Sequence, residues 1–352
     1  MDKEKLLSFI ENSFLKTLLV DPDITDISYN GQSIFYLHNH LGRRKSDIEI
    51  TENEVRDFIR QIANLTEKQF SYQSPKLDVS VDKYRINAVH TSIARINNEK
   101  CINFSIRVAG DTPRITKEST FLNAELISLF DVLVNSHISL VIGGITGSGK
   151  TEFQKYLISI VPKYSRIIII DDILELDNLR LGDDIDINVW QADERNEETN
   201  IQQLVKNALR SNPDWLIVAE SRGKEMIEVL NSAMTGHPII TTIHALDINS
   251  MPTRIARMVV MNNKDQNFDI LLQNIYYNFR FYVFLKREIK DDGTVHRYIE
   301  EVSEFDNRGH KTCIYRFEKG KHFFFQIRKE VLEKLAYQNN KTFIQTFVKG
   351  EK

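Results

Sequence analysis

Apolar residues in the first third of the chain alternate between a helical and a strand-like spacing. Residues 2–19 place apolar side chains on one face of a helix, whereas residues 24–29 and 33–38 have the short pattern of strands separated by a turn at Asn30-Gly31. A capping box at residues 51–54 opens a second helix. Further strands are expected at 76–81, 85–90 and 102–108. Residues 1–110 are therefore predicted to form a small α+β domain.

The pattern changes at a polar stretch with glycine and proline, which indicates a linker at residues 111–120. Beyond it, helical segments alternate with continuous apolar runs at 138–142, 166–170, 215–219 and 239–243. Such runs are typical of parallel strands buried on both faces, and the alternation predicts a mainly parallel sheet. Later strands are expected at 275–285, 298–305 and 322–327, and a helix at 329–337. The predicted fold class is α/β, with a larger domain over residues 121–352.

A glycine-rich motif lies between the first apolar run and a helix. Residues 144–151 read Gly-Ile-Thr-Gly-Ser-Gly-Lys-Thr and match the phosphate-binding loop G-x-x-x-x-G-K-[ST]. A strand, a glycine loop and a helix N-terminus together point several backbone N–H groups at one anion. Lys150 can then reach the β- and γ-phosphates, and Thr151 can hold Mg²⁺. The residues predicted to bind ATP are Gly144, Thr146, Gly147, Ser148, Gly149, Lys150, Thr151 and Glu152.

Polar side chains follow three of the apolar runs, at the strand ends where open α/β sheets gather their functional groups. They are Asp171, Asp172 and Glu175, then Glu220 and Arg222, and then His244. Each acid has a structural alternative, because acids after a strand often cap the next helix. Glu220 stands where a phosphate-loop ATPase has the acid that holds Mg²⁺ or orients water. His237 and His244 are expected near opposite ends of one strand, too far apart to share a metal ion.

Composition narrows the function classes. The chain has 352 residues, a net charge of −3 and two cysteines, Cys101 and Cys313. The charge argues against dominant nonspecific nucleic-acid binding, and two distant cysteines provide neither a disulfide framework nor a four-thiolate zinc site. We find neither a signal-peptide pattern nor an apolar run of about 20 residues that could span a bilayer. A cytoplasmic protein that reaches a membrane through partners is expected.

Four boxes together carry a resemblance. The chain resembles the secretion ATPase superfamily of type II and type IV secretion and type IV pili in four sequence boxes: the phosphate loop and residues 170–176, 209–223 and 235–245. These boxes occur in the order found in that superfamily and at about the same spacing. Residues 18–27, 30–31, 84–90 and 105–107 add similarity to the branch that serves type IV secretion and tight-adherence pili. The resemblance covers most of residues 15–306.

This resemblance implies a RecA-like ATPase domain after the N-terminal domain, and a homo-hexameric ring that uses ATP and Mg²⁺. The ring would work at the cytoplasmic face of the inner membrane, with platform or secretion-channel proteins as partners and no direct binding of nucleic acid. The implied roles are an acidic box that orients water (Asp171, Asp172, Glu175), a histidine box (His237, His244), and cations that reach the γ-phosphate (Arg85, Arg107). Glu220, with Arg222 after it, is implied to be the acid that ends the Walker B strand and to hold Mg²⁺ together with Thr151. The alternative for Arg85 and Arg107 is that they are surface arginines of strands.

The chain departs from the family pattern at several positions. Asp171 stands where glutamate is usual, Ala219 replaces a glycine and Ser221 an apolar residue, and the interval between His237 and His244 matches the retraction ATPases. Two alternatives to a secretion or pilus motor remain. A RecA-like nucleic-acid motor would be stimulated by DNA or RNA. An ATP-binding subunit with little turnover is favoured only by Asp171.

Overall fold

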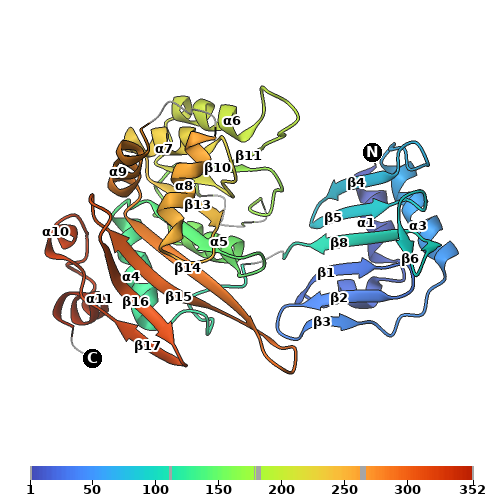
Figure 1. The fold of residues 1–352 in the computed structure, drawn as a ribbon, viewed down its shortest axis with the longest axis horizontal. Coiled ribbons are helices and arrows are strands. Elements are labelled where there is room, and N and C mark those ends of the chain that lie inside the picture. Colours follow the sequence, from blue (N-terminus) through green and yellow to red (C-terminus); the bar gives the residue numbers. More distant parts are fainter. Residues whose placement is uncertain (1, 111–112, 178, 180–183, 262–266, 351–352) are drawn as a thin grey trace. The chain divides into compact units, whose positions relative to one another are not determined.

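The computed structural model describes residues 2–110, 113–177, 179, 184–261 and 267–350 (Figure 1). The chain forms two compact units, one of Met1–Asp111 with Glu288–His296 and the other of Thr112–Arg287 with Arg297–Lys352. The domain limits expected at residues 110 and 120 stay predictions. Residues 111–112 of the predicted linker lie outside the described residues, and 113–120 contain no helix or strand. Within the described part, no helix is long and apolar enough to cross a membrane.

The first unit is an antiparallel sheet in the order β3-β2-β1-β8-β5-β4. Burial alternates along its strands, as in β4, where Leu77, Val79 and Val81 are buried and the residues between them are exposed. The buried face packs against helices α1 and α3 (Figure 1). The elements are α1 (Lys3–Glu11), α2 (Lys16–Leu19), β1 (Ile24–Tyr29), β2 (Ile34–His38), β3 (Gly42–Lys45), α3 (Glu52–Leu65), β4 (Lys76–Val81), β5 (Tyr84–Val89), β6 (Arg95–Ile96), β7 (Glu99–Lys100) and β8 (Asn103–Val108).

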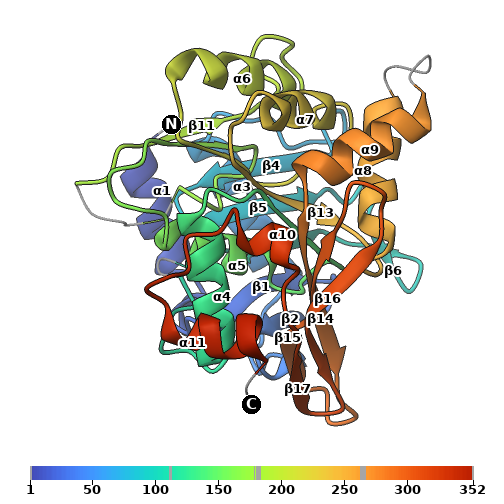
Figure 2. The same ribbon diagram turned by 90° about the vertical axis from the view of Figure 1, so that its left-hand side faces the viewer.

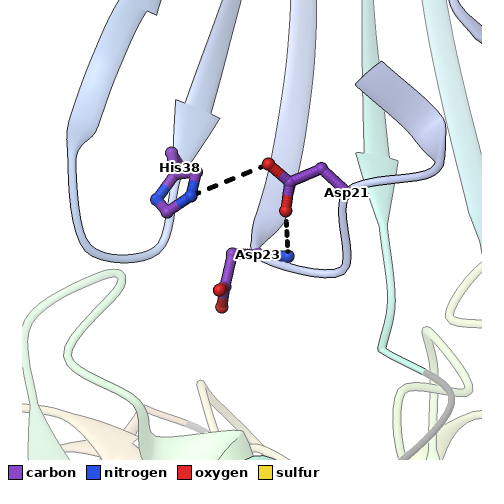
Figure 3. A group of neighbouring side chains, drawn as sticks. All are labelled: Asp21, Asp23 and His38. Atoms are coloured by element: carbon purple, nitrogen blue, oxygen red, sulfur yellow. Dashed lines mark hydrogen bonds and ion pairs between the residues drawn. The ribbon is translucent and has the colours of Figure 1, made fainter. Parts of the chain in front are cut away.

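Two aspartates and a histidine gather where β1 begins and β2 ends (Figure 3). Asp21 accepts the backbone N–H of Asp23 at 2.9 Å, and its other oxygen lies 3.7 Å from Nε2 of His38. Nδ1 of His38 accepts the backbone N–H groups of His40 and Leu41, at 3.1 and 3.2 Å. The proton of the neutral ring is therefore on Nε2, the nitrogen that a metal ion would need. The group is held by hydrogen bonds to the backbone beside the start of β1 and the end of β2, at the end of this strand pair opposite to its turn at residues 30–33.

The second unit is a sheet in the order β11-β10-β12-β13-β9-β14-β15-β16-β17, parallel from β11 to β14. Strands β9, β10 and β12 are buried along their whole length. In β10, Ile167 and Ile169 pack in one core with α4 and α5, and Ile168 and Ile170 pack in another with α6 to α9. The C-terminal helix α11 lies beside α4 (Figure 2). The strands are β9 (Leu140–Gly144), β10 (Ile167–Asp171), β11 (Ile187–Gln191), β12 (Trp215–Val218), β13 (Ile239–His244), β14 (Phe281–Ile289), β15 (Val295–Phe305), β16 (Lys311–Glu318) and β17 (Lys321–Phe324). The helices are α4 (Ala124–Asn135), α5 (Lys150–Ser159), α6 (Ile201–Ala208), α7 (Met226–Met234), α8 (Ser250–Val260), α9 (Phe268–Asn278), α10 (Lys329–Leu332) and α11 (Lys341–Phe343).

Some predicted elements differ from the structure. The strand expected at 275–285 is wrong in its first part, because α9 continues to Asn278 and β14 begins at Phe281. Asn267 caps that helix by accepting the N–H groups of Asp269 and Ile270. An asparagine at this position favours a helix start, but the aromatic residues that follow led to the prediction of a strand. The helix expected at 329–337 spans only Lys329–Leu332. Strands β3, β6, β7, β11 and β16 were not predicted.

A buried carboxylate fastens the end of β15 to its neighbours. Glu304 is fully buried and accepts hydrogen bonds from Nη2 of Arg280 at 2.8 Å and from Nε of Arg328 at 2.9 Å. Arg280 directly precedes β14 and Arg328 directly precedes α10, so one side chain joins three segments. A buried charge is stable only while such partners remain.

Replacing Glu304 by glutamine should lower the free energy of unfolding by about 3 kcal/mol, because both arginines lose a buried charged partner. Glu300→Gln is the matched control on the same strand, since Glu300 is about one-third exposed and pairs with Lys286 at the surface. We expect it to change stability by less than about 0.5 kcal/mol. Urea denaturation measures both without adding salt. Equal stability of the two variants would contradict the role of Glu304 in joining these three segments.

Candidate functional site

The glycine loop bends tightly between β9 and α5. Gly147 and Gly149 have φ angles of +73° and +96°, a backbone conformation that L side chains rarely adopt. A Cβ atom at Gly144 would lie 2.6 Å from the carbonyl oxygen of Leu285 in the adjacent strand β14. Glycine is therefore required at these three positions by backbone conformation or close packing.

Two buried polar groups of the loop lack an anionic partner among the described residues. Lys150 is 8% exposed, and its Nζ donates to the carbonyl oxygens of Gly144 and Ile145, each at 3.1 Å. Burial lowers the pKa of Lys150, whereas the negative charges of Glu220 and Glu175 raise it. Ser148 Oγ is buried and makes no hydrogen bond within the described chain. A phosphate in the loop would satisfy both groups.

The remaining predicted loop residues differ in their surroundings. Thr146 is exposed, and Thr151 is half-buried in the first turn of α5. The carboxylate of Glu152 accepts the backbone N–H of Arg114 at 2.9 Å and Nζ of Lys155 at 3.0 Å. Glu152 therefore ties the segment before α4 to the helix that follows the loop.

Four charged or ionisable side chains at the ends of three strands contact one another in series. Arg222 donates from Nη1 to Asp172 and from Nη2 to Glu220, both at 2.9 Å. The other oxygen of Glu220 lies 2.8 Å from Nε2 of His244. The hydrogen bond to Glu220 is the main reason that the pKa of Arg222 is raised. Burial and the charge of Lys150 lower the pKa of His244, whereas the charge of Glu220 raises it. The net shift is downward and favours a neutral imidazole.

Asp171 has a different environment from its neighbour Asp172. It is 1% exposed, and its two carboxylate oxygens accept the backbone N–H groups of Ile173 at 2.9 Å and Leu176 at 3.0 Å. Burial raises the pKa of Asp171, and the two hydrogen bonds oppose that shift. Asp171 thus holds the turn that carries Asp172 and Glu175.

The two histidines of the predicted box lie at opposite ends of β13. His244 pairs in register with Gly144, at the edge where the glycine loop begins. His237 precedes the strand, and its Nδ1 lies 3.1 Å from the hydroxyl of Thr235. The structure therefore brings His244, but not His237, to the group around Glu220.

Arg85 and Arg107 belong to the first unit, where they are directly opposite each other on β5 and β8. Nε of Arg85 lies 3.9 Å from Asp78, and Nε of Arg107 lies 3.5 Å from Asp26. Both arginines are about half exposed on the face of the sheet that the helices leave open. Their contact with a nucleotide stays a prediction.

Two supporting residues were not predicted from the sequence. Gln154 on α5 is fully buried and donates to the carbonyl oxygens of Val218 and Ile240, at 3.0 and 3.3 Å. The carboxylate of Glu225 accepts the backbone N–H groups of Arg222 and Gly223. For Gln154, its place one turn before the apolar residues Leu157 and Ile158 was an available signal. The contacts of Glu225 depend on a turn that residue types alone do not reveal.

A glycine loop between a buried parallel strand and a helix, with acids at the ends of neighbouring strands, defines a phosphate-loop NTPase fold. Residues 92–346 match the family described as type II/IV secretion system protein, and the chain belongs to that family. The predicted superfamily is thereby confirmed.

Individual relatives agree with this assignment. An uncharacterized protein of Bacillus anthracis is 31% identical over 85% of this chain and 68% of its own length. The type IV secretion system protein VirB11 of Brucella suis is 32% identical over 46% of each chain. The X-ray structure of the Legionella pneumophila ATPase DotB has a TM-score of 0.63 and 19% identity, covering 87% of this chain and 82% of that chain. This likeness confirms the predicted fold class.

Asp171→Asn should destabilise the protein by about 1–2 kcal/mol, because the amide nitrogen cannot accept the N–H group that one carboxylate oxygen now accepts. Asp177→Asn is the control, since Asp177 is an exposed acid of the same turn. Urea denaturation at neutral pH measures both variants. If Asp171→Asn were as stable as the control, the carboxylate would not hold this turn.

Proposed function

We propose that this protein is an ATP-hydrolysing motor of a type IV secretion, conjugation or type IV pilus machine. The observation that carries the proposal is the buried Lys150 inside the glycine loop, beside the linked acids and bases of three strand ends. Membership in the type II/IV secretion system family supports it.

The triphosphate would bind in the loop formed by residues 144–151. Lys150 now donates to carbonyl oxygens of its own loop, so its ammonium group can transfer those hydrogen bonds to the β- and γ-phosphates. The buried hydroxyl of Ser148 would gain a phosphate oxygen as its partner. Backbone N–H groups at the start of α5 would complete the cradle.

The donor set also fits Mg²⁺, which prefers hydroxyl, carboxylate and water oxygens. Thr151 would contribute its hydroxyl and Glu220 its carboxylate, directly or through water. When bound, the ion would neutralise charge on the phosphate oxygens. Arg222 and His244 fix the orientation of Glu220 through their contacts with its two carboxylate oxygens.

Glu175 is our candidate for the base that accepts a proton from the attacking water. Its negative charge raises the pKa of Lys150, the lysine of the phosphate loop. Asp171 is less suited to this role, because both of its oxygens already accept backbone N–H groups. Asp172 is held by Arg222. The shorter side chain at position 171 therefore need not limit turnover.

The motor would act as a homo-hexamer, with Arg85 and Arg107 as cations that stabilise charge on the γ-phosphate in the transition state. VirB11 is named for a type IV secretion system and DotB as an ATPase, and these names support a machine of this kind. Its partners would be platform or channel proteins at the cytoplasmic face of the inner membrane. We expect no direct nucleic-acid partner.

The direct test is steady-state ATP hydrolysis by the purified protein in the presence of Mg²⁺. Lys150→Ala should abolish nucleotide binding and turnover, because the buried cation is lost. Glu220→Gln should keep binding but lower kcat by at least about 100-fold. The assembly mass with and without ATP tests the ring. Tight ATP binding without turnover in any assembly state would contradict the motor and favour a nucleotide-binding subunit, and stimulation by DNA would favour a nucleic-acid motor.

Glu175→Gln should lower kcat by about 100-fold with little change in KM, because a general base contributes on that scale. Asp171→Glu, which restores the residue usual in the family, should not raise kcat. Asp177→Asn again serves as a control in the same turn. A rise in kcat for Asp171→Glu, with Glu175→Gln unaffected, would instead make position 171 the base.

A further inference from the structure

Arginines outside the glycine motif lie against the phosphate loop. Nε of Arg297, on β15, donates to the carbonyl oxygen of Gly147 at 2.7 Å, across 150 positions of sequence. Arg287, on β14, approaches the same residue, since a Cβ atom built on Gly147 would lie 3.3 Å from its Nη1. Two strands thus bring guanidinium groups to the middle of the loop.

Positive charge is concentrated at this side of the loop. Burial, together with the charges of Arg287 and Arg114, lowers the pKa of Arg297 to about 10. Nε of Arg287 is buried and has no hydrogen-bond partner among the described residues. Grouped cations repel one another, and a bound anion nearby would reduce that repulsion.

The bond to Gly147 fixes the direction of one peptide group. Because the peptide is planar and trans, the carbonyl of Gly147 and the N–H of Ser148 point in opposite directions. While Arg297 holds the carbonyl outward, the N–H of Ser148 points inward and donates to the carbonyl oxygen of Ile145 at 3.2 Å. The carbonyl oxygen of Ile145 also accepts a hydrogen bond from Nζ of Lys150, so the N–H of Ser148 faces the side of the loop where the lysine lies.

We propose that Arg297 is a positioning residue of the nucleotide site, which holds the peptide between Gly147 and Ser148 so that its N–H faces the phosphates. Arg287 adds favourable charge beside it. This proposal rests on the proposed function, because it assigns how the loop reaches high affinity for phosphate. The phosphate-loop motif does not contain this interaction, which comes from strands far along the chain.

The test is a titration of the full chain with a fluorescent ADP analogue, together with KM and kcat for ATP. Arg297→Ala should raise Kd and KM by about tenfold, the scale of one lost charge-assisted hydrogen bond, and change kcat by less than about threefold. Arg297→Lys, which keeps the charge and a donor, should recover part of the affinity. Arg316→Ala is the matched control, because Arg316 lies on β16 in an ion pair with Glu301 and should leave Kd unchanged.

Thermal unfolding of each variant separates a loss of fold from a loss of affinity. Should Arg297→Ala not fold, Arg297→Lys decides, with an expected increase in Kd of about threefold. Unchanged Kd and KM in a folded Arg297→Ala, or in Arg297→Lys when the alanine variant is unfolded, would overturn this proposal alone. If the wild type binds no nucleotide, the proposed function fails and this proposal fails with it.

Discussion

The parallel pairing of β9 with its two neighbours is the constraint on which the site depends. Parallel strands end at the same edge of a sheet, so residues separated by about 100 positions arrive together. His244 of β13 and Leu285 of β14 both pair with Gly144, the first residue of the loop. Moving this register by one residue would turn every side chain to the other face and separate the loop from Glu220 and His244.

At this edge of the sheet, the partners of an acidic side chain depend on its position in the fold and not on its residue type. Asp171 and Asp172 are adjacent, yet one accepts backbone N–H groups in the interior and the other pairs with Arg222. Arg222 in turn joins Asp172 to Glu220, which reaches His244. Arg222 thus gives Asp172 and Glu220 a positively charged partner, whereas the buried Lys150 has only carbonyl oxygens as hydrogen-bond partners.

The sequence predicted the parts of the site that depend on local pattern. The loop at 144–151 and the polar residues after each strand follow from motif and apolar runs, and these also place His237 and His244 at opposite ends of one strand. It did not separate the roles of Asp171 and Asp172, because which backbone N–H groups an acid accepts depends on the turn that follows. Nor did it predict Gln154 and Arg297, whose partners lie on other elements. The strand expected at 275–285 was partly wrong because aromatic residues suit a strand and a buried helix alike.

The most direct test of the central claim is an experimental structure with a slowly hydrolysed ATP analogue and Mg²⁺. The triphosphate should lie within residues 144–151, and Nζ of Lys150 should have left the carbonyl oxygens of Gly144 and Ile145 for the phosphates. The carboxylate of Glu220 should face the bound ion. A nucleotide bound elsewhere, or Lys150 still bonded to its own loop in the complex, would contradict the assignment of this site.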